Sequence, residues 1–187
     1  MSLNNRLKIL SNLDFYEVGK DETGTYPLQY IIENLSTEEE INLTYSKIYP
    51  NFGKLCFDKF GSHIIEKVLK KTKYELINSL FQEKVKNHFL EYSLDANGIK
   101  VLKIFAVVLF NNKNEKEFES LLNVNLDYLI NNQFGNYLIQ CIIDNWSIEY
   151  SWKIANYFKG KYIILITQKF SSNVIEKLIF KLENVKF

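Results

Sequence analysis

The chain repeats one short pattern five times at nearly constant spacing. The pattern is clearest in NNQFGNYLIQCII, which runs from Asn131 to Ile143. A Gly or Ser pivot precedes the positions that correspond between repeats, and the steps between those positions are 37, 37, 37 and 36 residues. A fixed period of this size indicates an array in which each unit packs mainly against its neighbours. The corresponding positions are Thr25, Ser62, Ile99, Asn136 and Ser172.

The array is expected to be all-helical. Alternating β-branched stretches and Gly-rich turns are scarce, which favours a helical solenoid with short connections. A period in the high thirties also fits tetratricopeptide-like or HEAT-like arrays that bind proteins. We expect a single domain over 1–187, with an N-terminal cap at 1–20 and motif helices near 25–34, 62–71, 99–111, 136–145 and 172–182.

Two capping boxes are expected one period apart. Ser36 with Glu39, and Thr72 with Glu75, each have the spacing in which the two residues satisfy each other's backbone amides at a helix start. The chain shows no closing helix after the fifth motif helix, so its last apolar face needs another explanation. A cut from a longer array or a degenerate end is favoured over a covering partner or dimer.

Composition excludes several classes of function. With 47% hydrophobic and 24% charged residues the chain is ordinary for a soluble protein, and no apolar run approaches the roughly 20 residues that span a bilayer. The N-terminus lacks a signal-peptide core, so we expect a cytoplasmic protein, or a nuclear or nucleolar one, with no membrane partner. Two cysteines, Cys56 and Cys141, and two histidines cannot form a zinc-like cluster, so neither metal nor cofactor is expected.

Charge alone argues weakly for a nucleic-acid partner. The net charge is +1, distributed as −5 over residues 1–40, +4 over 41–100 and +2 over 101–187. Nucleic-acid binders often have a stronger basic balance. No nucleophile, base and orienting residue can be assigned, and there is no phosphate-binding loop, so neither catalysis nor a small-molecule substrate is expected.

The repeated runs resemble a known family. QKFSSNVIEKLI, from Gln168, and FGNYLIQ, from Phe134, are similar to Pumilio (PUF) repeats, and DKFGSHIIEKVL, from Asp58, resembles another. The resemblance implies a right-handed superhelical arc of three-helix repeats, similar to armadillo and HEAT arrays. It also implies that the second helix of each repeat meets one base of single-stranded RNA, and that protein co-regulators can bind the convex face.

In such repeats two residues four apart contact the base edge, and the residue after the first one stacks between bases. We call these the first reader, second reader and stacking positions. The first reader positions are Thr25, Ser62, Ile99, Asn136 and Ser172; the second are Gln29, Glu66, Lys103, Gln140 and Glu176; the stacking positions are Tyr26, His63, Lys100, Tyr137 and Asn173.

The chemistry of these side chains suggests which base each repeat reads. A carboxylate can accept both donors of guanine's Watson–Crick edge, so the Ser–Glu repeats suit G, whereas an amide such as Gln140 can match the edge of uracil. Ile99 cannot hydrogen-bond, so the third repeat is expected to tolerate any base, with Lys100 or Lys103 turned to phosphate. Gln29 is compatible with U or A.

Because the family binds RNA antiparallel to the chain, the predicted target is 5′-GUNGN-3′. The expected role is post-transcriptional regulation of messenger RNA through 3′ untranslated regions, with repression of translation. Two alternatives stay open. One is a pumilio-like ribosome-biogenesis factor that binds structured RNA, and the other is a helical scaffold that binds protein without RNA.

Overall fold

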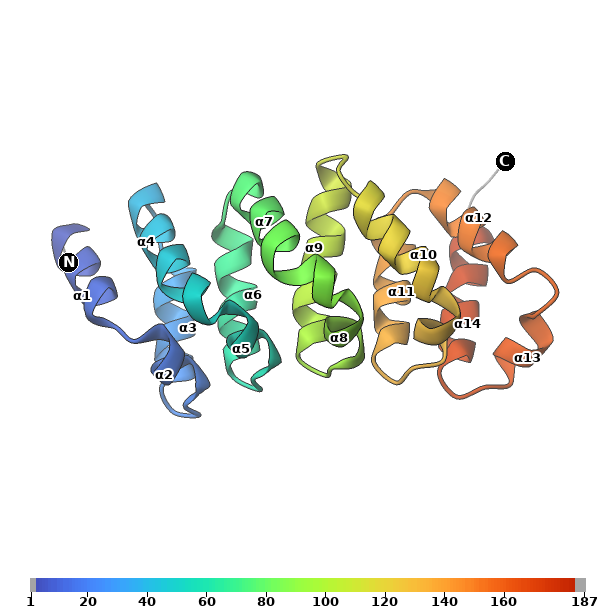
Figure 1. The fold of residues 1–187 in the computed structure, drawn as a ribbon, viewed down its shortest axis with the longest axis horizontal. Coiled ribbons are helices and arrows are strands. Elements are labelled where there is room, and N and C mark those ends of the chain that lie inside the picture. The colour runs from blue at the N-terminus through green and yellow to red at the C-terminus, as the bar shows by residue number, and fades with distance from the viewer. Residues whose placement is uncertain (1–2, 184–187) are drawn as a thin grey trace. The chain divides into compact units, whose positions relative to one another are not determined.

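The computed structural model describes residues 3–183, and every regular element in that range is helical (Figure 1), which confirms the all-α class. Residues 1–2 and 184–187, which the predicted domain includes, lie outside the described residues. The α-helices are α1 (Leu3–Asn12), α2 (Phe15–Lys20), α3 (Thr25–Glu33), α4 (Glu38–Ile48), α5 (Phe52–Phe57), α6 (Gly61–Lys71), α7 (Tyr74–Leu80), α8 (Phe89–Leu94), α9 (Gly98–Asn111), α10 (Lys116–Ile130), α11 (Gly135–Asn145), α12 (Ile148–Tyr157), α13 (Tyr162–Ile166) and α14 (Ser171–Glu183).

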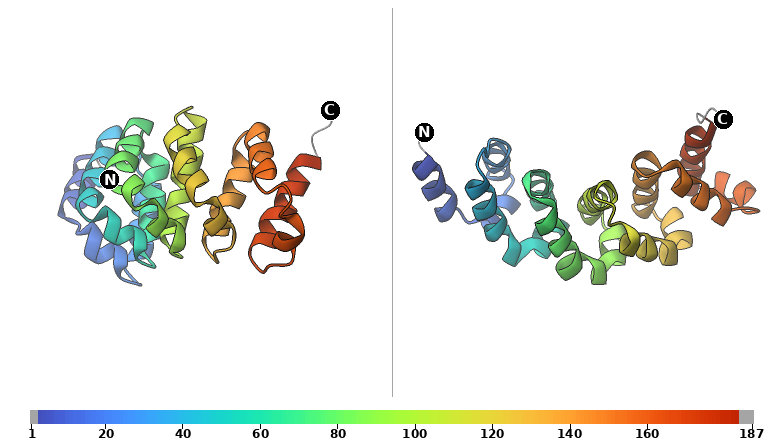
Figure 2. Two further views of the ribbon diagram at one scale, coloured as in Figure 1. Left: turned by 45° about the vertical axis from the view of Figure 1, so that its right-hand side comes forward. Right: turned by 90° about the horizontal axis from the view of Figure 1, so that it is seen from above.

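The chain divides into two compact units, with the boundary between Asn87 and His88. In the first unit α3 packs against α6, α5 packs on α6, and α1 packs on α4. In the second unit α11 lies beside both α9 and α14, as Figure 2 also shows. The five helices α3, α6, α9, α11 and α14 carry the reader and stacking positions, and we call them the motif helices. The single domain over 1–187 stays a prediction.

Four of the five motif helices begin with the same side-chain turn. The accepting residue lies four residues before the first reader position. Its carboxylate or amide oxygen accepts hydrogen bonds from the backbone amides two and three residues after the accepting residue. These bonds satisfy amide groups that the helix itself leaves unpaired. The accepting residues are Asp21, Asp58, Asp95 and Asn132, at 2.6 to 3.0 Å.

The pivot residue lies too close to the preceding helix for most side chains. A Cβ on Gly61 would lie 2.8 Å from the carbonyl oxygen of Leu55, and one on Gly135 would lie 2.8 Å from Leu129 Cδ2 and 3.0 Å from its backbone. The fifth repeat has Ser171 instead, and its buried hydroxyl donates to the carbonyl oxygen of Leu165 at 2.8 Å. The same close approach is therefore reached either without a side chain or with one that bonds the facing carbonyl.

Gly135→Ala should destabilise the protein, because the added methyl group must displace the α10 backbone, at a cost of about 1 to 3 kcal/mol. The measurement is the free energy of unfolding in urea. Gly19→Ala is the matched control, since a Cβ there would be 3.4 Å from its nearest neighbours and loss of a helical glycine alone is favourable. Equal effects of the two substitutions would contradict the steric explanation.

Neither expected capping box forms as predicted. At the start of α4 the box joins Thr37 and Glu40 rather than Ser36 and Glu39, since Thr37 Oγ1 accepts from the Glu40 amide at 3.2 Å and Glu40 accepts from the Thr37 amide at 3.0 Å. At the second place Thr72 Oγ1 donates back to a carbonyl oxygen of α6, and α7 begins after Lys73 with no side-chain cap.

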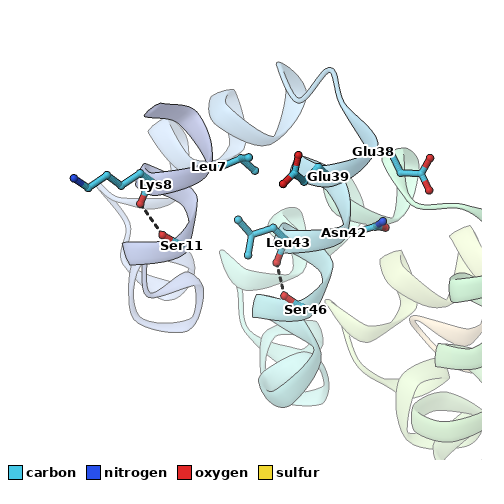
Figure 3. Close-up of a pocket in the computed structure, with 8 residues that line it drawn as sticks. All are labelled: Leu7, Lys8, Ser11, Glu38, Glu39, Asn42, Leu43 and Ser46. Atoms are coloured by element: carbon cyan, nitrogen blue, oxygen red, sulfur yellow. Dashed lines mark hydrogen bonds between the residues drawn. The ribbon is translucent and has the colours of Figure 1, made fainter. Parts of the chain in front are cut away.

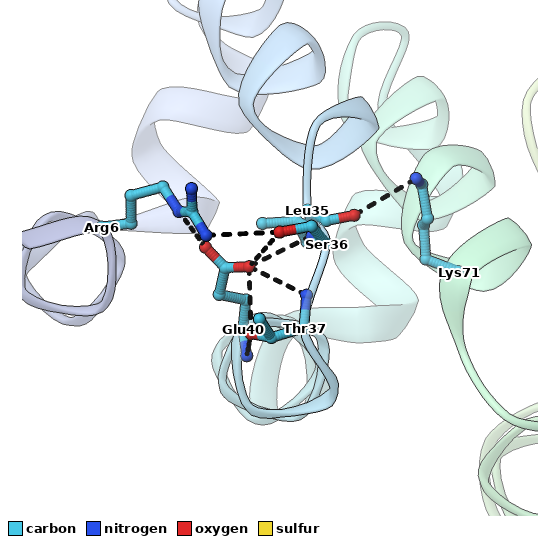
Figure 4. A network of polar contacts seen from close by, with 6 residues as sticks. All are labelled: Arg6, Leu35, Ser36, Thr37, Glu40 and Lys71. Carbon is cyan, nitrogen blue, oxygen red and sulfur yellow. Dashed lines mark hydrogen bonds and ion pairs between the residues drawn. The ribbon is translucent and has the colours of Figure 1, made fainter. Parts of the chain in front are cut away.

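The shift to Glu40 has a long-range cause. Glu40 is buried, and Arg6 of α1 donates to its carboxylate at 2.5 Å (Figure 4). Burial alone would raise the pKa of Glu40, but the amides of Ser36 and Thr37 together with the Arg6 guanidinium lower it to about 2. A buried carboxylate is tolerated only when it is bonded in this way, so the contact with α1 selects which of two adjacent glutamates caps the helix.

The Arg6–Glu40 pair lies beside a groove between α1 and α4. The groove has a volume of about 890 Å³ and is lined by Leu7 and Leu43 together with polar side chains (Figure 3). The buried Leu10, the Arg6–Glu40 pair and a hydrogen bond from Lys47 of α4 to the Ser11 carbonyl oxygen attach α1 on the sides that the groove leaves in contact.

This attachment should weaken in acid. Because the pKa of Glu40 in the folded state, about 2, lies below its ordinary 4.5, the stabilisation is complete above about pH 4.5 and is lost as the pH falls toward 2. Thermal unfolding across that range should show a steeper loss for the wild type than for Glu40→Gln, which lacks the ionised group. Parallel pH profiles for the two proteins would contradict this account.

The core-facing stripe of the motif helices shows one difference at the fifth repeat. Residues three after the first reader position are at most 1% exposed in all five helices. Residues seven after it are equally buried in four helices, but Ile179 of α14 is 48% exposed. The residues three after are Leu28, Ile65, Leu102, Ile139 and Ile175, and the buried residues seven after are Ile32, Leu69, Ala106 and Ile143.

Candidate nucleic-acid interface

The two reader positions of a repeat have different environments. Four of the five first reader positions face inward, since Thr25, Ser62 and Asn136 are at most 1% exposed and Ile99 is also buried, whereas Ser172 is half-buried. The second reader positions are half-buried or, at Glu176, exposed. In this structure, then, the second reader position presents most of the polar surface. Direct base contact by the first stays a prediction.

In the fourth repeat the buried residue orients the outer one. Asn136 Nδ2 donates to the carbonyl oxygens of Asn132 and Gln133, at 2.8 and 3.0 Å, which leaves its Oδ1 as an acceptor. Gln140 Nε2 donates to that Oδ1 at 2.8 Å, so the side-chain oxygen of Gln140, Oε1, is left for another partner. The first repeat is similar, with Gln29 Nε2 donating to Thr25 Oγ1 at 3.2 Å.

In the second repeat the serine hydroxyl is bonded to the backbone and the carboxylate is left as an acceptor. Ser62 Oγ donates to the Lys59 carbonyl oxygen at 3.3 Å. Glu66 has one nearby cationic group, His63 Nδ1 at 3.6 Å, which pairs with it only when the imidazole is protonated. This repeat therefore presents a carboxylate beside a ring.

The fifth repeat has the same arrangement without the histidine. Ser172 Oγ donates to the Lys169 carbonyl oxygen at 3.5 Å, and Asn173 of the stacking position donates to the same carbonyl at the same distance. Glu176 is exposed and has no hydrogen-bond or ionic partner among residues 3–183. It is therefore a carboxylate with both oxygens available to a donor pair.

Three of the five stacking positions present a ring to solvent. Tyr26 is 66% exposed, Tyr137 is 52% exposed, and the His63 side chain is 44% exposed. An exposed aromatic ring offers a flat apolar face that an unpaired base can cover. In the third repeat Lys100 is instead half-buried and donates to Asn97 Oδ1 at 3.2 Å.

The third repeat differs at every reader position. Ile99 is buried and offers no polar atom. Lys103 lies near the Cys141 thiol of α11, where burial raises the pKa of the thiol and the lysine charge opposes that rise. Its predicted phosphate contact stays a prediction. Within residues 3–183 neither cysteine takes part in a disulfide bond.

One groove brings predicted residues of two consecutive repeats together. It lies between α11 and α14 and has a volume of about 780 Å³. Tyr137, Gln140, Asn173 and Glu176 line it, so two second reader positions and two stacking positions share one concave site. The groove also contains residues that the sequence did not single out, namely Asp144, Lys177, Phe180 and Lys181.

The recurring helix start is a further feature that was missed. Asp58 and its counterparts bind the amides at the start of four motif helices, and their recurrence four residues before the first reader position was visible in the sequence without indicating a role. Within residues 3–183 no group of His, Cys, Asp or Glu side chains is arranged to hold a metal ion. In the same range no helix has the length and apolar character to cross a membrane.

Comparison with known proteins identifies the family. The chain matches the Pumilio-family RNA binding repeat over residues 51–83, 127–156 and 161–182. It is 31% identical over 160 residues to a Pumilio domain-containing protein of Schizosaccharomyces pombe, covering 84% of this chain and 23% of that protein. It is also 31% identical over 158 residues to Pumilio homolog 9 of Arabidopsis thaliana, covering 84% of this chain and 27% of that protein.

Solved structures of RNA-binding domains are also similar to this chain in fold and sequence. The Puf4 RNA-binding domain bound to the HO endonuclease RNA 3′ UTR recognition sequence matches with a TM-score of 0.82 and 28% identity, over 97% of this chain and 57% of that one. The RNA-binding domain of yeast Puf5p bound to SMX2 RNA matches with a TM-score of 0.73 and 26% identity, over 99% of this chain and 54% of that one.

The helical fold and the matched repeats together define an array of RNA-binding-type helical repeats. The chain belongs to the Pumilio (PUF) family, which is a family of RNA-binding repeats and not of enzymes. It spans about a quarter of the length of the curated relatives and just over half of the solved domains.

Proposed function

We propose that the protein binds single-stranded RNA in a sequence-selective manner through the motif helices, with one base per repeat and the preference 5′-GUNGN-3′. The observation that carries the proposal is the groove between α11 and α14, lined by Gln140 and Glu176 beside Tyr137 and Asn173. A base edge and a base face can each find a partner there, which is how unpaired RNA bases are recognised.

The base preference follows from the outer residues. Glu176 and Glu66 accept the paired donors of guanine. The side-chain oxygen of Gln140 accepts the single N–H of uracil, while the side-chain NH₂ group of Gln140 can donate to a neighbouring carbonyl of the same base. Two first reader residues act in this scheme by orienting the outer side chain, Asn136 for Gln140 and Thr25 for Gln29.

The regulatory role rests on the relatives. The solved Puf4 domain is bound to a 3′ UTR recognition sequence. By that similarity we propose that the protein acts in the cytoplasm on 3′ untranslated regions of messenger RNA, in post-transcriptional regulation that represses translation through protein partners.

The base preference can be tested by fluorescence anisotropy at one fixed salt concentration. Wild-type protein should bind 5′-GUAGA-3′ more tightly than 5′-AUAGA-3′, by about 1 to 3 kcal/mol, the usual cost of one mismatched base. Glu176→Gln should remove most of that difference, because an amide presents one acceptor instead of two. Glu149→Gln, on α12 and exposed, is the matched control and should preserve it.

Binding that is equal for matched and scrambled RNA, with a steep salt dependence, would contradict sequence reading and favour the structured-RNA alternative. No binding to any RNA, together with a co-purifying protein, would favour the scaffold alternative.

Stacking can be tested separately from the base edge. Tyr137→Ala should weaken RNA binding by about 1 to 3 kcal/mol, the usual contribution of one stacked base. Its thermal unfolding should change little, since the ring is 52% exposed. Tyr128→Ala on α10 removes a similarly exposed ring, 57%, from a helix without reader positions and should leave binding unchanged. A similar loss for both variants would exclude a specific role for Tyr137.

A further inference from the structure

The junction between α3 and α6 is held by two lysines of the later helix. Lys67 pairs with the Glu33 carboxylate of α3, and that hydrogen bond lowers the pKa of Glu33. One helical turn further on, Lys71 Nζ donates to the Leu35 carbonyl oxygen at 3.4 Å, just beyond the C-terminal end of α3. Positive charge is favourable at that end of a helix.

The junction between α11 and α14 has the same arrangement in the other unit. Lys177 pairs with the Asp144 carboxylate of α11, and Lys181 Nζ donates to the Asp144 carbonyl oxygen at 3.2 Å. The two lysines are again one turn apart, and the carboxylate again lies near the C-terminal end of the earlier motif helix.

The positions correspond in the two junctions. The lysines lie five and nine residues after the first reader position, and each carboxylate lies eight residues after the first reader position of the earlier helix. The other two later helices have different residues at the lysine positions, namely Ile104 and Val108 in α9 and Cys141 and Asn145 in α11. The lysine pair therefore occurs in the two repeats whose second reader residue is glutamate.

This coincidence has an electrostatic meaning. Lys67 directly follows Glu66 in the chain, and Lys177 directly follows Glu176. A long lysine side chain without a partner would be attracted to the neighbouring carboxylate, or to the phosphates of a bound RNA, because both are negative. A carboxylate on the preceding helix gives the ammonium another partner, and Glu176 has no ionic partner among residues 3–183.

We propose that Glu33 and Asp144 are positioning residues for base selection, which hold Lys67 and Lys177 away from the reader glutamates and thereby keep those carboxylates available to guanine. The inference rests on the proposed RNA-reading function and adds two residues to it. Each residue affects the preference for guanine at one position only. Asp144 affects the first G of 5′-GUAGA-3′, and Glu33 affects the second.

The test measures discrimination at each G separately. Asp144→Asn should reduce the preference for GUAGA over AUAGA by about two- to fivefold, the range that a partly exposed ion pair supports, and leave the preference over GUAAA unchanged. Glu33→Gln should do the reverse. Asp144→Glu keeps the charge and should retain wild-type discrimination. The freed lysine of Asp144→Asn should also steepen the salt dependence of binding by up to about one phosphate contact.

The outcomes separate the two levels of the proposal. A wild-type protein that prefers neither G would overturn both the proposed function and this inference. If the wild type prefers both G bases, the inference alone would be overturned by either of two results. Asp144→Asn and Glu33→Gln could leave discrimination unchanged, or each could lower it equally at both positions. Thermal unfolding of each variant shows whether an equal loss comes from general destabilisation.

Discussion

The rotation of each motif helix about its axis is the constraint on which the remaining features depend. A side-chain oxygen such as that of Asp58 accepts from the amides of Phe60 and Gly61 at the start of the helix, and the pivot at Gly61 brings the first turn against the preceding helix. Because a residue in a helix turns by a fixed angle from the one before it, setting the first turn sets the direction of every later side chain. Ile65 then lies in the core, while Glu66, the next residue, lies at the surface.

The same rotation explains why the two reader positions are unequal. The first reader position lies at the edge of the apolar stripe, so Asn136 is enclosed, whereas Gln140 lies one turn further along and reaches the groove. A buried amide needs partners, and Asn136 finds them in two backbone carbonyls and in Gln140. Satisfying the buried group and orienting the exposed one are thus parts of one hydrogen-bond chain.

Sequence reasoning was successful where the governing interactions are local. The period and helical spacing predicted an all-α array and placed Tyr137 and Gln140 on one surface, because both depend only on residues a few positions apart. It failed where the choice is made by distant residues. Ser36 and Thr37 have equivalent spacing to a glutamate, and Arg6, about thirty residues earlier, decides between them. The burial of Thr25 and the partners of Lys177 likewise depend on which helices become neighbours.

The alternative pivot residues show that the close packing of a motif helix does not depend on which side chains occupy its reader positions. Gly135 and Ser171 reach the same close approach by different means, and neither occupies a reader or stacking position. A mutation at an outer position such as Glu176, which is exposed and lines the groove, changes the polar pattern there and leaves the helix start and the apolar stripe intact. Descendants of such a chain can therefore change the polar surface of one repeat at a time, by single substitutions, without passing through an unfolded intermediate sequence.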